Sequence, residues 1–217
     1  MRTNTLKAMW RTVLTIVSIG LGSSAVLAQQ PPSIGQVTAL QGQATGQHAG
    51  NTQAIPLSVA SLVYREDIIQ TLAASKIKLV LLDGTELSLG EVSTMILSKF
   101  VYTPQQRAHQ GIINIARGIF RAVTRKVFPQ TTFEVRTATA VAAVRGTQWL
   151  GEVTPEATAI TVIEGEVAVA HAQARIGGAV VLMPGQGTDV EGQQPPTAPK
   201  LWAAERVSRL LQATTLP

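Results

Sequence analysis

Three histidines, His48, His109 and His171, are the first candidates for acid–base or metal chemistry in this chain. They are far apart in the sequence and lie in polar, loop-like surroundings, and no two have the spacing of paired metal ligands. The sequence has no cysteine, which rules out disulfides and thiolate ligands. We therefore predict that each histidine is a solvated loop residue and that the protein has no metal site and no cofactor.

The positions of the carboxylates in the sequence do not indicate a catalytic role either. Asp67, Asp83 and Asp189 lie beside glycines or at strand starts, where aspartate commonly shapes turns. Glu164 and Glu166 flank Gly165, and alternate residues of a strand share one solvated face. There is no nucleophile elbow, phosphate-binding loop or dinucleotide fingerprint. We expect a protein that is not an enzyme; the alternative is a carbohydrate- or peptidoglycan-directed enzyme, which needs two carboxylates about 5 to 10 Å apart in a cleft.

Positive charge is concentrated in the middle of the chain. Eight basic residues and a single acid, Glu134, lie between positions 99 and 145; the basic residues are Lys99, Arg107, Arg117, Arg121, Arg125, Lys126, Arg136 and Arg145. Such a cluster can form a positive face for an anionic lipid, an acidic glycan or an acidic protein. Nucleic acid is not expected, because the interleaved aromatic residues of single-strand binders are missing. The alternative is that these side chains scatter over several faces and only keep the protein soluble.

The N-terminus predicts export. Residues 1–28 combine Arg2, Lys7 and Arg11 with an uncharged run of 17 residues, Thr12–Ala28, that ends in small residues. This is typical of a cleaved signal peptide, and the run is shorter than the about 20 apolar residues that span a membrane. An uncleaved anchor is the alternative. Removal of 1–28 lowers the net charge from +5 to +2. We expect a periplasmic or secreted protein without a further transmembrane helix.

Short strands dominate the rest of the chain and would position any functional side chain. A polar leader, 29–33, precedes a β domain at 34–191, in which Asp83-Gly84 separates two alternating runs as a hairpin turn. Glycines recur two residues after an apolar one and predict corners between short strands, as in a β-solenoid or a sandwich. The segments concerned are Leu40–Thr45, Ala116–Val123, Val144–Leu150, Ile163–Val169 and Leu182–Val190.

A proline-rich linker, 192–200, leads to an amphipathic helix at 201–213. We expect this helix to pack against the β domain; the alternative is a docking element for a partner.

The stretch from Thr132 to Gly151 predicts a strand followed by a corner. Phe133 and Val135 alternate with Glu134 and Arg136, and Gly146 can turn the chain toward Trp149. We interpret Arg145 as a structural residue whose guanidinium hydrogen-bonds the carbonyl groups freed at this corner.

These segments, in this order, resemble the FecR-domain family of bacterial envelope proteins. The matching segments are "GQVTALQGQA" (35–44), "EDIIQT" (66–71, with Glu66 in place of a glycine), "SKIKLVLLDGTELSLG" (75–90), "RGIFRAV" (117–123), "FEVRTATAVAAVRGTQW" (133–149, with Thr137-Ala138 in place of Thr-Pro), "VIEGEVAV" (162–169) and "MPGQG" (183–187). The resemblance implies an all-β, solenoid- or sandwich-like domain in the periplasm, here with a short C-terminal α-helix.

The best-known members of this family relay a signal from an outer-membrane receptor to a cytoplasmic anti-sigma segment. Only about 11 residues precede the apolar run here, so we expect a stand-alone exported domain. The expected function is non-catalytic binding or scaffolding of an envelope partner, either a protein or an anionic glycan or lipid. The alternative within the family is a periplasmic component of FecR-type signalling.

Overall fold

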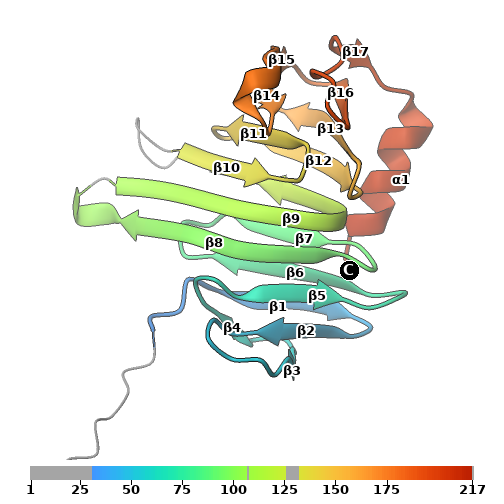
Figure 1. Cartoon of the computed structure of the whole chain (residues 1–217). Coiled ribbons are helices and arrows are strands. Elements are labelled where there is room, and N and C mark those ends of the chain that lie inside the picture. The colour runs from blue at the N-terminus through green and yellow to red at the C-terminus, as the bar shows by residue number, and fades with distance from the viewer. Residues whose placement is uncertain (1–30, 107, 126–131, 217) are drawn as a thin grey trace, which may run out of the picture. The chain divides into compact units, whose positions relative to one another are not determined.

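The computed structural model describes residues 31–106, 108–125 and 132–216. The expected export signal at 1–28 and two of the eight basic residues, Arg107 and Lys126, lie outside the described residues. The fold is all-β with one C-terminal helix, as the sequence predicts (Figure 1). No helix among the described residues is both long and apolar enough to cross a membrane.

The strands form two layers that share one long strand, β9. Layer A has the order β4 (Leu62–Val63), β1 (Gly35–Gln41), β6 (Lys76–Leu81), β7 (Glu86–Leu89), β9 (Ala108–Val123), β12 (Gln148–Val153), β13 (Ala157–Glu164), β16 (Gln186–Glu191) and β17 (Lys200–Leu201). Layer B has the order β3 (Ile55–Pro56), β2 (Ala44–Gln47), β5 (Ile68–Thr71), β8 (Thr94–Thr103), β9, β10 (Thr132–Arg136), β11 (Ala140–Val144), β14 (Val167–His171) and β15 (Ala179–Leu182). Short 3₁₀ turns, η1 (Pro104–Gln106) and η2 (Ala174–Ile176), follow β8 and β14. All pairings are antiparallel except β9 with β10.

Both layers alternate buried and exposed residues, so that one face of each layer lines a shared core. In β6, for example, Ile77, Leu79 and Leu81 are buried and the residues between them are half-buried. Side chains from both layers join a single apolar cluster. Burial of this cluster supplies most of the stabilising free energy, since the chain has no disulfide to restrict its unfolded state.

The chain crosses between the layers at corners where one residue has a positive φ. Five of these residues are the predicted corner glycines: Gly42, Gly118, Gly146, Gly165 and Gly185. Four more crossings use a residue other than glycine, namely Ala60 (φ 71°), Glu66 (φ 67°), Ala74 (φ 53°) and Val92 (φ 50°). Glycine adopts this backbone conformation without the steric cost that a side chain brings. The sequence prediction of glycine corners is therefore confirmed.

Position 118 also has no room for a side chain. It bends β9, whose earlier part pairs in layer B and whose later part, from Gly118 to Val123, pairs with β12 in layer A. A methyl group at position 118 would lie 2.6 Å from the Cα of Ser93 and closer still to its side chain. The Ser93 hydroxyl accepts a hydrogen bond from the Ile119 N–H at 3.2 Å in this corner.

Most crossings of the N-terminal half lie at one edge, and those at Gly146, Gly165 and Gly185 in the C-terminal half lie at the opposite edge. The edge with fewer crossings is called the open edge of each half; in the N-terminal half the passage from β4 to β5 through Glu66 still crosses there. At the open edge of the N-terminal half, Asp83 of the β6–β7 turn meets His109 of β9, with His109 Nε2 2.7 Å from Asp83 Oδ2. Both side chains are almost completely buried, at 1% exposure for His109 and 0% for Asp83. The two atoms do not meet the geometry of a hydrogen bond, so this is a close polar contact.

Hydroxyl groups close the open edge of the C-terminal half. Thr158 of β13 contacts Thr137 at 2.6 Å and Thr139 at 2.8 Å, both in the β10–β11 turn of layer B. The His171 ring accepts from the Gln173 N–H at Nδ1 and, in the tautomer that this requires, donates from Nε2 to the Gly192 carbonyl. Polar side chains thus join the layers where the backbone does not.

His109 and His171 correct the prediction of solvated loop histidines, since both lie on strands and are 5% exposed. His48 is half-buried and its Nδ1 lies 2.9 Å from Asp67. The turn-shaping role predicted for aspartate is confirmed at Asp83, which accepts from the N–H and hydroxyl of Thr85 at 2.9 and 2.7 Å.

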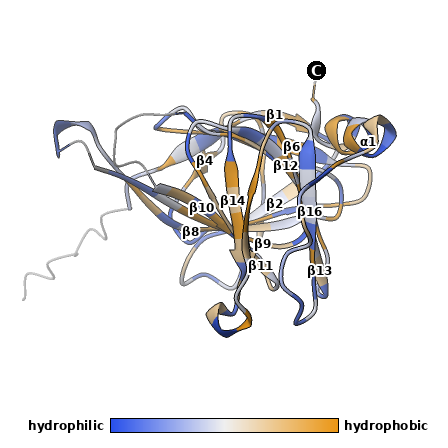
Figure 2. Cartoon of the chain, turned by 90° about the horizontal axis from the view of Figure 1, so that it is seen from above, coloured by the Kyte–Doolittle hydropathy of each residue, from blue (hydrophilic) through white to orange (hydrophobic). Residues whose placement is uncertain are grey.

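Helix α1 (Ala204–Thr214) lies against the outer face of layer A (Figure 2). Its Leu210 is fully buried on Leu150 and Ala159, and Trp202 lies over Gly187, where no side chain could fit. Arg209 forms two hydrogen bonds with Glu152, at 3.0 and 2.7 Å, and these bonds lower the pKa of Glu152 although partial burial acts in the opposite direction. The segment before the helix follows β16, where the Thr197 N–H donates to the Asp189 carbonyl at 3.0 Å. The helix therefore packs on its own domain, as expected.

We expect Gly118→Ala to destabilise the protein more than Gly50→Ala. Both glycines have a positive φ, which costs an alanine about 1 kcal/mol. Only position 118 is crowded, since a methyl group at position 50 meets no atom within 4 Å. Overpacking adds about 1 to 3 kcal/mol to the cost at Gly118. Urea unfolding of both variants measures the difference, and equal losses would contradict this account of the corner.

The Asp83–His109 contact makes stability depend on pH. Burial acts to raise the pKa of Asp83, but the contacts from His109 and Thr85 outweigh burial and leave the pKa below its ordinary value. A carboxyl group with a lowered pKa stabilises the folded protein above its unfolded-state pKa, near 4, and this contribution disappears as the pH falls through the folded-state value.

Accordingly, Asp83→Asn should lower the free energy of unfolding by about 3 kcal/mol at pH 7, because it leaves His109 buried without its partner. The difference in free energy of unfolding between variant and wild type should be smaller at pH 3 than at pH 7, because stability that comes from a lowered carboxyl pKa begins to be lost below the unfolded-state value near 4. Denaturant titrations at the two pH values test this, and a difference independent of pH would show that the carboxylate charge is unimportant.

Candidate functional site

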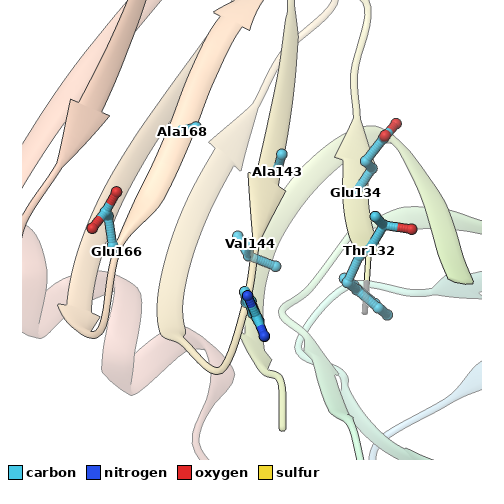
Figure 3. A pocket seen from close by; sticks show the side chains of 8 residues that line it. Thr132, Glu134, Ala143, Val144, Glu166 and Ala168 are labelled. Atoms are coloured by element: carbon cyan, nitrogen blue, oxygen red, sulfur yellow. The ribbon is translucent and has the colours of Figure 1, made fainter. Parts of the chain in front are cut away.

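The outer face of layer B carries a hollow at the predicted signature stretch (Figure 3). In β10, Phe133 and Val135 point into the core, which leaves Thr132 and Glu134 on the outer face. The same alternation places Ala143 of β11 and Ala168 of β14 outward, directly opposite one another. The hollow has a volume of about 390 Å³, and its lining residues are Thr132, Phe133, Glu134, Ala143, Val144, Arg145, Glu166 and Ala168.

The floor of the hollow is apolar because the central strands carry small side chains. Ala143 pairs with Ala168, and the next strand continues this row with Val181, which is 46% exposed. Alanine side chains are too short to fill the space between the longer residues on either side. The result is a depression with apolar sides and charged groups at its rim.

Two of the charged groups at the hollow have no ionic partner among the described residues. Arg145 and Glu166 are both exposed, and neither forms an ion pair or a side-chain hydrogen bond within the described ranges. Glu134 differs, because its Oε2 accepts hydrogen bonds from Arg136 Nε and Nη2 at 3.0 and 2.7 Å. Arg145 and Glu166 are therefore available to a ligand, whereas Glu134 is already paired with Arg136.

Arg145 does not have the role that the sequence suggested. It is exposed, and no corner carbonyl within the described residues accepts a hydrogen bond from it. Gly146 does form the corner, with a φ of 67°. The buried anchor of this stretch is Trp149, whose ring meets the edge of Phe120 at a centroid distance of 5.0 Å. The corner is held by backbone conformation and aromatic packing, so the arginine can face solvent.

The basic residues of the middle segment do not form one face. Lys99 and Arg136 lie on the outer face of layer B, since their strand partners Ile112 and Asn114 belong to the same face of β9. Arg121 lies on layer A, beside the C-terminal end of α1. The prediction of a single positive face is therefore not supported by the described residues, and the scattered alternative describes them better.

No metal-binding cluster emerges from the described part of the chain. Within 31–106, 108–125 and 132–216, no group of three or more histidine and carboxylate side chains could hold a metal ion. Glu134 and Glu166 are the carboxylates at the hollow, and they come from β10 and from the start of β14, on either side of β11 (Figure 3). Neighbouring strands lie about 4.8 Å apart, so these carboxylates are separated by roughly 10 Å or more at the backbone.

Comparison with known proteins confirms the resemblance to the FecR family. The family model described as "FecR protein" matches residues 67–168, and this region is a FecR domain. Two crystal structures of a proposed anti-sigma factor from Parabacteroides distasonis ATCC 8503 have a similar fold, each with a TM-score of 0.54 and 21% sequence identity. The match covers 67% of this chain and 64% of the other, just under two thirds of its length. Comparison with curated proteins found no match.

We expect Arg145→Ala to leave stability unchanged to within about 0.5 kcal/mol, because the side chain is exposed and unpaired. Trp149→Ala, four residues away, should cost about 3 to 5 kcal/mol through the loss of a buried ring. Thermal and urea unfolding of the two variants makes the comparison. A loss for Arg145→Ala similar to that for Trp149→Ala would restore the structural role for the arginine.

Proposed function

We propose that this protein is a non-catalytic FecR-domain module that acts outside the cytoplasm and binds a protein partner through the hollow on layer B. The observation that carries the proposal is the pair of unengaged charges, Arg145 and Glu166, beside the apolar floor of Ala143 and Ala168. Export to the periplasm or beyond is part of the proposal and rests on the signal-like segment at 1–28.

A protein partner fits the hollow better than an anionic glycan or lipid does. Arg145 would attract an anion, but Glu166 at the same hollow would repel it. A polypeptide can present an apolar side chain to the floor and charges of both signs to the rim. Apolar contact in the centre with charged groups around it is also the usual arrangement of protein interfaces.

The outer faces of the two layers differ in a way that supports this choice. On layer A, Leu150 and Ala159 are covered by α1. On layer B, no described helix covers the corresponding residues of β11, β14 and β15, and Val181 remains 46% exposed. Layer B therefore offers an apolar surface that no described helix covers.

A role in FecR-type signalling is the second candidate. It is supported by the FecR match at residues 67–168 and by the shared fold of the proposed anti-sigma factor. In that case, the partner at the hollow would be another component of the signalling system. The enzyme alternative gains no support from the hollow, since Glu134 is bound by Arg136 and lies across β11 from Glu166.

The test compares Arg145→Glu with Arg65→Glu. Both replace an exposed, unpaired arginine and change the net charge equally, but Arg65 lies outside the hollow. Each tagged variant is produced in cells of the source bacterium, and partners recovered from the envelope fraction are quantified against wild type. We expect Arg145→Glu to reduce recovery of the partner roughly tenfold, as for a contact worth more than about 1 kcal/mol. Equal recovery with both variants would contradict a site at the hollow.

A further inference from the structure

The last strand of layer B, β15, has a free edge. It pairs with β14 through Ala179–Ala170, Val180–Val169, Val181–Ala168 and Leu182–Val167. No other described segment forms a backbone hydrogen bond with Ala179–Leu182. The N–H and C=O groups on its outer side are therefore without a backbone partner within the described residues. Val181 and the adjacent Met183 are 46% and 48% exposed.

Layer A ends differently, because its last long strand is covered. Residues Lys200 and Leu201 pair with Gln186 and Gly187 of β16. The Thr188 hydroxyl of β16 also donates a hydrogen bond to the Thr197 carbonyl, at 2.7 Å. The C-terminal segment thus pairs with one terminal strand, whereas at β15 it only approaches Gly178, through Pro195, and leaves Ala179–Leu182 without a backbone partner.

The sequence of β15 has none of the features that usually keep an edge strand from pairing. Ala179–Leu182 contains no charge and no proline, and its register with β14 has no bulge. Natural edge strands are commonly protected by lysine, proline, bulges or coverage. An uncharged, regular, exposed edge is a template for another extended strand.

We propose that β15 pairs in antiparallel fashion with β15 of a second copy of this chain, about a two-fold axis perpendicular to the sheet. An uncharged strand can lie against itself without repulsion. The flanking charges are complementary in this arrangement, since exposed Arg175 precedes the Ala179 end and exposed Glu166 lies beside the Leu182 end. Antiparallel pairing brings the arginine end of each copy to the glutamate end of the other.

The pleat of the strand restricts the register. Ala179 and Val181 face outward, and Leu182 faces the core. A two-fold axis perpendicular to the sheet keeps the outer faces of both copies on the same side. Opposed residues must then have the same orientation, so the axis passes through a residue. An axis through Val181 opposes Val181 to itself and Ala179 to Met183, which extends the exposed apolar row across both copies.

The affinity of such a dimer is low because its interface is small. A four-residue strand buries much less than the about 1,200 Å² of a standard stable interface. We therefore expect association that depends on protein concentration. The dimer and the partner at the hollow would share Glu166, but the pairing of the β15 edge is tested separately by the two experiments below.

Because the sequence has no cysteine, a single introduced thiol can be used to crosslink the dimer of the full chain by a disulfide. Val181→Cys places a thiol on the proposed two-fold axis, and Val59→Cys places one at a site that is 58% exposed and away from β15. Under mild oxidation, the Val181→Cys variant should form a disulfide-linked dimer at a rate roughly ten times or more that of the control, because pairing raises the effective thiol concentration. Equal rates would overturn the proposal.

Sedimentation velocity of the cysteine-free protein provides the second measurement. Wild type should show a dimer that increases with concentration, and Val181→Lys should abolish it without changing the thermal unfolding midpoint. A wild-type protein that stays monomeric, or a dimer that survives Val181→Lys, would overturn the proposal. A monomeric protein whose β15 instead pairs with a strand of a different protein would overturn it as well.

Discussion

The need to turn the chain from one layer to the other determines most of this structure. The described crossings carry a residue with a positive φ, which is a glycine at five corners and Ala60, Glu66, Ala74 or Val92 at the others. Most crossings lie at one edge in the N-terminal half and at the other in the C-terminal half, and β9 is the strand that takes part in both layers. Because few backbone crossings join the layers at the other edge of each half, side chains close that edge. The buried Asp83–His109 contact and the hydroxyl cluster around Thr158 do this.

The same arrangement explains why the two outer faces differ. Layer A receives the C-terminal helix, which buries Leu150 and Ala159 and ties its Arg209 to Glu152. Layer B receives no such cover from the described residues, and its small side chains leave a hollow beside Arg145 and Glu166. This FecR domain thus has one face covered by its own helix and one face, which we call the open face, that no described helix covers. The proposed partner site and the free edge of β15 both belong to the open face.

Local features were predictable from the sequence and long-range contacts were not. The glycine corners, the Asp-Gly turn and the alternation around Phe133 depend on neighbouring residues, so their pattern is visible in the chain. The signature stretch also identified the family. His109 appeared to be a loop residue, because its partner Asp83 is 26 positions away and only the stacking of two layers brings them together. Arg145 was assigned a structural role because an arginine beside a corner glycine suggests carbonyl contacts. The hollow depends on three strands whose small outward residues, Ala143 and Ala168 among them, carry no recognisable motif.

Photo-crosslinking in living cells tests most directly whether layer B is the partner face. A photoreactive amino acid is placed at Ala143, on the outer face of layer B, or at Gln36, which is exposed on the outer face of layer A away from α1. Both positions are on the surface, so neither substitution should disturb the core. We expect a discrete crosslinked partner from position 143 and none from position 36. Crosslinks from position 36 alone would contradict it and would move the partner site to layer A.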